Sequence, residues 1–145
     1  MSESHVKDQE DIRNLKSVYA RRADAALCTP SAEAARALVE LFVDDALLDL
    51  GPFGRYQGRE QLLHAFENVL PGATAWSVHH FTNPLIEVKG DSATGSWYFL
   101  IYAQSRATPA PPVGVIHGGY SDKYVRVGGA WKIAETIASF TAPAT

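Results

Sequence analysis

Apolar positions recur at helical spacing in the first half of the chain. They predict a helix over residues 9–28, with an apolar stripe formed by Ile12, Leu15, Val18, Tyr19, Ala23 and Ala26. Thr29-Pro30 breaks this helix. Ser31 is placed to cap a second helix, whose apolar set is Ala35, Leu38, Val39, Leu41 and Phe42. Residues 1–6, which precede the pattern, are polar and expected to be loose.

The pattern then changes, with one more helix among strands. A short strand over 46–50 leads into a hairpin marked by Gly51-Pro52 and Gly54, and a third helix is expected over 59–69, ended by Pro71-Gly72. Four long strands are predicted at 75–89, 93–105, 113–126 and 130–141. Two tight hairpin turns are expected, at Lys89-Gly90-Asp91 and at 127–130, and a proline-rich loop at 108–112.

This order of elements predicts an α+β fold in a single domain, residues 1–145. The predicted strands are longer than the usual ~5–6 residues, so the antiparallel sheet is expected to be strongly twisted and bent. A sheet curved around N-terminal helices encloses a cone-shaped pocket, with apolar walls and a few placed polar groups.

Composition narrows the classes of function. A net charge of −3 supplies no basic field for nucleic acid or an anionic membrane. The single cysteine, Cys28, has no partner for an internal disulfide or a thiolate metal site. His79, His80 and His117 do not have the spacing of zinc ligands, and neither a phosphate-binding loop nor a serine nucleophile motif occurs. We therefore expect no metal and no cofactor. Without a signal-like segment or an apolar run of ~20 residues, a cytoplasmic location is the expectation.

Three side chains are candidates for proton transfer: Tyr19, Asp24 and His80. Asp24 closes the first helix, where the negative end of the dipole and burial would both raise its pKa. A helix turns by ~100° per residue, and this rotation places Asp24 off the apolar stripe. The alternative to a catalytic role is therefore a solvent-exposed aspartate at the end of the helix. His79 and His80 point to opposite faces of a strand, and we expect His80 to face the pocket and pair with Asp24.

Aromatic and aliphatic side chains are expected to line the pocket. Trp97, Phe99 and Ile101 share one face of their strand, while Tyr98, Leu100 and Tyr102 share the other. Such a stripe is usually core, with only some members in contact with a ligand. The full set of candidates for substrate binding is Phe53, Tyr56, Trp97, Phe99, Ile101 and His117.

Several stretches of the chain resemble sequences of one known family, and they follow one another in the same order as in that family. They are residues 12–24, 41–45, 56–60, 80–83, 90–95, 119–124 and 131–134. The chain resembles the SnoaL-like group of the nuclear transport factor 2-like superfamily, whose fold is a cystatin-like α+β barrel. That group includes polyketide cyclases, scytalone dehydratase, bile-acid 7α-dehydratase and hexachlorocyclohexane dehydrochlorinase.

The resemblance implies an Asp24–His80 base, with Tyr19 five residues before the aspartate as in the bile-acid dehydratase. It also implies self-association as a homodimer or homotrimer. Both dehydratases carry a further Asp or His on the next strand, and residues 103–105 here do not. His117, on the following strand, is the candidate substitute.

Together these features predict a cofactor-independent lyase, isomerase or cyclase acting on a hydrophobic cyclic or aromatic small molecule, with dehydratase-type proton abstraction foremost. The main alternative is a non-catalytic binding or oligomerisation module on the same fold. A weaker alternative is the β-subunit of a ring-hydroxylating oxygenase, because the chain lacks the extra length of those subunits.

Overall fold

A computed structural model of the chain describes residues 2–141 and has the α+β architecture expected. The first half contains the helices α1 (Glu3–Cys28), α2 (Ala32–Val39), α3 (Arg59–His64) and α4 (Leu70–Ala73), with the short strands β1 (Phe42–Asp49) and β2 (Arg55–Gln57). A 3-10 turn, η1 (Gly51–Phe53), joins β1 to β2, and a π-helical turn, η2 (Ala65–Val69), joins α3 to α4. The second half contains the long strands β3 (Thr74–Lys89), β4 (Ser92–Ser105), β5 (Gly114–Val127) and β6 (Ala130–Phe140).

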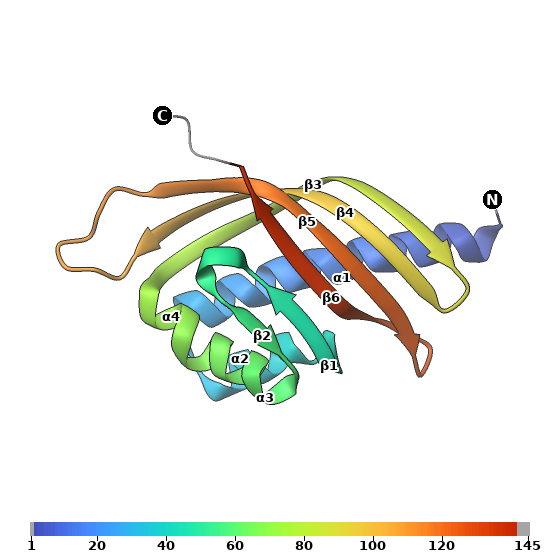
Figure 1. The fold of residues 1–145 in the computed structure, drawn as a ribbon, viewed down its shortest axis with the longest axis horizontal. Coiled ribbons are helices and arrows are strands. Elements are labelled where there is room, and N and C mark those ends of the chain that lie inside the picture. The colour runs from blue at the N-terminus through green and yellow to red at the C-terminus, as the bar shows by residue number, and fades with distance from the viewer. Residues whose placement is uncertain (1, 142–145) are drawn as a thin grey trace.

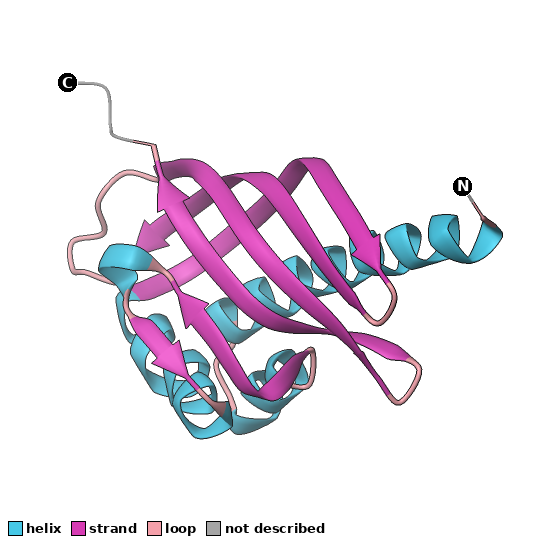
Figure 2. Ribbon diagram, turned by 45° about the vertical axis from the view of Figure 1, so that its right-hand side comes forward, coloured by secondary structure: helices cyan, strands magenta, loops and turns pink. Residues whose placement is uncertain are grey.

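The strands form one six-stranded sheet in the order β2-β1-β6-β5-β4-β3. All neighbours are antiparallel except β1 and β6, which run parallel, so the sheet is mixed at one pair. The sheet arches over α1, which crosses its concave side (Figure 1). In Figure 2 the N-terminal half of α1 runs beside the β3–β4 hairpin, and the Gln9 side chain there donates to the carbonyl oxygen of Ile86.

The first helix is longer than the apolar pattern indicates. It begins at Glu3, because the Ser2 hydroxyl accepts a hydrogen bond from the backbone N–H of His5 and so caps it. The expectation that residues 1–6 are loose is therefore wrong for 3–6, while residue 1 lies outside the described residues. The predicted stripe is confirmed, with Ile12, Tyr19 and Ala23 at most 2% exposed.

Two other boundaries differ from the sequence expectation. The second helix ends at Val39, and Phe42 begins strand β1 rather than completing that helix. Both interpretations bury Phe42, because an apolar run at the end of a helix does not distinguish helix from buried strand. Pro71 does not end the third helix, because α3 continues through the π-helical turn η2 into α4, which contains Pro71.

The four long strands lie within one residue of their predicted bounds, and the hairpin turns contain Gly90, Gly128 and Gly129 in the left-handed region. Strand β4 alternates as expected: Trp97, Phe99 and Ile101 are buried, whereas Tyr98, Leu100 and Tyr102 are exposed. Its pairing with β3 shifts register between Thr82 and Leu85, next to Asn83 with a φ of 55°. This irregularity helps the sheet to curve around α1.

No helix of residues 2–141 is long and apolar enough to cross a bilayer.

Candidate active site

The end of α1 meets strand β3 at an aspartate–histidine pair. The Nδ1 atom of His79 lies 2.5 Å from Oδ1 of Asp24, and the backbone N–H of His79 donates to Oδ2 at 3.2 Å. The Ser77 hydroxyl donates to Oδ1 of the same carboxylate at 2.8 Å. These contacts hold the imidazole in one orientation, as a carboxylate does in known acid–base pairs.

The histidine in this pair is His79, not the expected His80. Side chains alternate along a strand, and Ser77, His79 and Phe81 all face α1. His80 faces the other side of the sheet, where its Nδ1 lies 3.3 Å from the carbonyl oxygen of Leu100 and its ring packs edge-on to Tyr102. The pairing predicted for Asp24 therefore exists with the neighbouring histidine.

The electrostatic expectation for Asp24 also needs correction. Partial burial raises the pKa of this carboxyl, but the hydrogen bonds and charge of His79, together with the Ser77 hydroxyl, outweigh it and lower the pKa below its ordinary value. The helix dipole, which we expected to raise it, does not prevail. Asp24 is therefore an anion at neutral pH, suited to orient and stabilise a charged imidazole rather than to take a proton itself.

A cavity of about 80 Å³ opens beside His79 between the sheet and the helices. Its walls are mostly apolar, and come from α1, the η1 and η2 turns, α4 and the long strands. They consist of Tyr19, Ala23, Leu27, Leu50, Phe53, Phe66, Leu70, Thr74, Ser77, His79, Ile101, Ala103, Ile116, Tyr120 and Phe140. Asp24 is not part of this wall, but it contacts two residues that are, Ser77 and His79.

The structure places the predicted ligand contacts in two groups. Phe53 and Ile101 line the cavity, and so does Tyr19, which was a candidate for proton transfer. Trp97 and Phe99 are buried in the adjoining core: the Trp97 indole donates to the Tyr124 hydroxyl, and the Phe99 ring packs on Tyr120.

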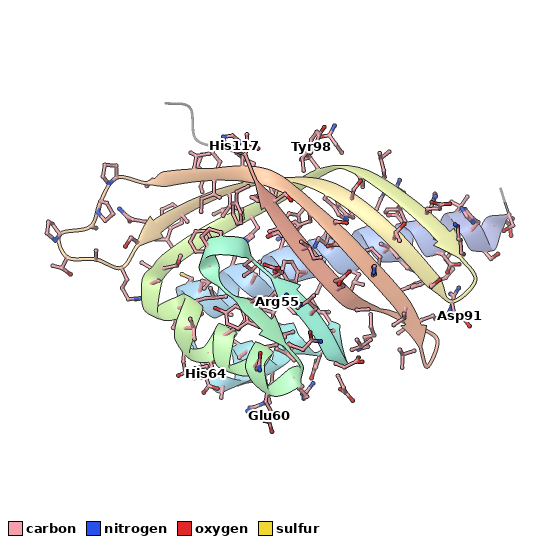
Figure 3. The ribbon with its side chains drawn as sticks, in the orientation of Figure 1. Arg55, Glu60, His64, Asp91, Tyr98 and His117 are labelled. Atoms are coloured by element: carbon pink, nitrogen blue, oxygen red, sulfur yellow. The ribbon has the colours of Figure 1, made fainter. Side chains whose placement is uncertain are left out.

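The other two predicted ligand contacts also lie outside the cavity wall. Tyr56 donates its hydroxyl to the carbonyl oxygen of Phe53, beside the hairpin turn. His117 projects from the outer face of the sheet, as does Tyr98 (Figure 3). It therefore does not substitute for the Asp or His absent from residues 103–105.

Sequence reasoning missed Ser77 and Tyr120, and it placed His79 on the face away from the pocket. A signal for Ser77 and His79 was present, because these two residues alternate with Phe81, an apolar residue that belongs inside. Tyr120 lies in a strand whose inward face the sequence pattern leaves unassigned, and only the coordinates place it at the cavity.

Comparison with known proteins identifies the family and the fold of the chain. The SnoaL-like domain profile matches residues 4–137. The chain belongs to the SnoaL-like domain family. A search of curated proteins finds no individual protein that matches the chain.

Solved structures share the fold of the SnoaL-like domain. A protein from Novosphingobium aromaticivorans DSM 12444, named provisionally as a scytalone dehydratase, is 22% identical with a TM-score of 0.84, covering 98% of this chain and 89% of that one. Hexachlorocyclohexane dehydrochlorinase LinA-type3 from Novosphingobium barchaimii LL02 is 22% identical with a TM-score of 0.79, covering 95% and 89%. A nuclear transport factor 2-like protein from Salmonella enterica is 17% identical with a TM-score of 0.78, covering 99% and 96%. At these identities the likeness establishes the nuclear transport factor 2-like fold.

Proposed function

We propose that this SnoaL-like domain is a cofactor-independent lyase, isomerase or cyclase that removes a proton from a hydrophobic cyclic small molecule. The observation that carries the proposal is the His79 imidazole, held by the Asp24 carboxylate at 2.5 Å and forming part of the wall of an apolar cavity. An oriented imidazole beside a carboxylate is a general base suited to neutral pH.

The proposed chemistry uses the two ring nitrogens differently. Nδ1 is engaged by Asp24, which leaves Nε2 to take a proton from a substrate carbon. Asp24, held as an anion by Ser77 and His79, then stabilises the imidazolium that forms. Elimination, double-bond isomerisation and aldol-type cyclisation share this first step.

The cavity wall supports a neutral, apolar substrate. Among the described residues no Lys, Arg, Asp or Glu lines the cavity. A charged substrate would lose its hydration there without a counter-charge in the wall, which is costly. The structural neighbours named as a dehydratase and a dehydrochlorinase favour elimination as the first reaction to test.

The test is turnover of three compound classes in D₂O, followed by proton nuclear magnetic resonance: cyclic β-hydroxyketones, chlorinated cyclohexanes and β,γ-unsaturated cyclic ketones. We expect one class to react, with the rate reduced by about 10²–10⁴-fold in the His79→Gln variant. Asp24→Asn should also lose most activity. His80→Gln is the matched control, since His80 lies on the opposite face, and it should retain activity.

Equal turnover in the His79→Gln variant and the wild type would remove His79 from the mechanism. Binding of these compounds with no turnover or deuterium incorporation would instead support the alternative, a non-catalytic small-molecule-binding module on the same fold.

A further inference from the structure

The cavity meets solvent at the η1 turn, where Phe53 forms part of its wall. The Phe53 side chain is 46% exposed, whereas the other described residues of the wall are buried or half-buried. A wall residue with this much solvent contact marks the mouth of the cavity. The Phe53 ring packs against that of Phe140 at the end of β6, with the ring centroids 5.6 Å apart. These two rings together narrow the mouth.

The backbone of Phe53 is held by local hydrogen bonds, which leaves its ring as the part that moves. Its N–H donates to the carbonyl oxygen of Leu50 at 3.1 Å, and its carbonyl oxygen accepts from the Tyr56 hydroxyl at 2.8 Å. On either side, Gly51 and Gly54 have φ of 58° and 113°, values that other residues rarely adopt. The turn therefore has a set shape. A half-exposed side chain on such a turn changes rotamer on the order of nanoseconds.

Another part of the wall, where α1, α4 and β3 meet, is held together by Arg106. Its Nε donates to the carbonyl oxygen of Pro71 at 2.7 Å, and a terminal nitrogen donates to those of Thr74 at 3.1 Å and Leu27 at 3.4 Å. Leu27, Thr74 and Leu70, which precedes Pro71, all line the cavity. Moving this part of the wall would break hydrogen bonds to a charged group, whereas turning the Phe53 ring breaks none.

The volume of the cavity limits what enters while Phe53 keeps its place. An engineered apolar cavity of about 150 Å³ in another protein binds benzene, whereas this cavity is about 80 Å³. A six-membered ring therefore fits here only when a side chain of the wall moves. A phenyl ring that turns outward vacates the space of one such ring, but not of two.

We propose that Phe53 is the specificity-determining residue of this site: its ring closes the mouth of the cavity against Phe140 and limits the substrate to a single six-membered ring. The inference rests on the proposed function and narrows its hydrophobic cyclic substrate, because compounds with two fused rings would need more space than the outward turn of Phe53 supplies.

The test uses two hydrocarbons that carry no group for His79 to act on, so its failure is distinguishable from failure of the proposed function. Benzene and naphthalene are titrated into the full chain, and binding is followed by shifts in its nuclear magnetic resonance spectrum. We expect the wild type to bind benzene in preference to naphthalene. Phe53→Ala should strengthen naphthalene binding about tenfold and change benzene binding far less, because the space at the mouth is then permanently open.

The measured quantity is the ratio of the two dissociation constants. Phe53→Leu keeps an apolar side chain without the width of a ring, and it should give an intermediate ratio. Val69→Ala is the matched control, since Val69 is 42% exposed on η2 and lies outside the cavity wall, and it should keep the wild-type ratio. An unchanged ratio in Phe53→Ala, an equal change in Val69→Ala, or no binding of either hydrocarbon to the wild type would each overturn the proposal.

Discussion

At the scale of single residues, Asp24 shows that a residue outside the apolar stripe of its helix can still make specific contacts inside the fold. It lies off the apolar stripe of α1, and its side chain is 25% exposed. Three hydrogen bonds from β3 nevertheless converge on its carboxylate, from the Ser77 hydroxyl, the His79 ring and the His79 backbone. The long strand beside the helix supplies all of these donors, so periodicity within the helix could not reveal them.

We expect Asp24→Asn to lower the free energy of unfolding at pH 7 by about 1–2 kcal/mol, a modest figure because part of the side chain is solvated. The pKa of Asp24 is lower in the folded state than its ordinary value of about 4. Its contribution to stability is therefore present above pH 4 and lost as the pH falls through the folded-state pKa. Urea unfolding across this range checks the prediction, with exposed Asp44→Asn as control. A wild-type–variant difference that grows on acidification would contradict it.

At the scale of elements, the register of β3 decides which histidine faces the cavity. Because side chains alternate with a period of two, a shift of one residue exchanges the whole set facing the cavity for the set facing outward. Phe81 packs on Tyr19 and Tyr120, which fixes the inward set as Ser77, His79 and Phe81. The choice between the adjacent histidines thus depends on the packing of Phe81.

Close packing of β5 on β6 gives a prediction for the same sheet. A Cβ added at Gly118 would lie 2.1 Å from the carbonyl oxygen of Ser139 and 2.8 Å from Cζ of Phe99. We expect Gly118→Ala to lower the free energy of unfolding by about 3 kcal/mol, because backbone cannot move aside as a flexible side chain can. Gly114→Ala, on the same strand, meets only an ordinary contact at 3.6 Å and should cost far less. Denaturant melts of the two variants measure this, and equal stabilities would contradict it.

At the scale of the whole molecule, the sheet has two apolar faces, and the helices of residues 2–141 cover one of them. On the uncovered side, Val78, Tyr102 and Val115 form a row across β3, β4 and β5. Tyr98 is 65% exposed and projects from the same face (Figure 3), two residues before the exposed Leu100 on β4. A contiguous exposed apolar patch on a folded domain is typical of an interaction surface.

We expect this face to pair with further copies of the chain, as a homodimer or homotrimer. A Leu100→Glu/Tyr102→Glu variant should then become monomeric, because carboxylates would be buried without partners in the interface. Light scattering after size-exclusion chromatography measures the mass. Val6→Glu, which adds a carboxylate at an exposed position on α1, should leave the assembly intact. A monomeric wild type, or an assembly that survives in the double variant, would refute this surface.

The sequence by itself determined the kinds of element, the bounds of the long strands to within a residue, the α+β fold and the family. These depend on local periodicity, turn residues and motifs, which act over a few positions. The resemblance to the family also indicated a pair between Asp24 and a histidine of the first long strand, but it indicated His80 where the structure has His79. The tertiary structure alone decided that His79 faces the cavity, and that Phe53 and Ile101 line it while Trp97 and Phe99 do not. Those features depend on which side chains from distant segments pack together, and a difference of one residue in register or half a turn in a helix reverses them.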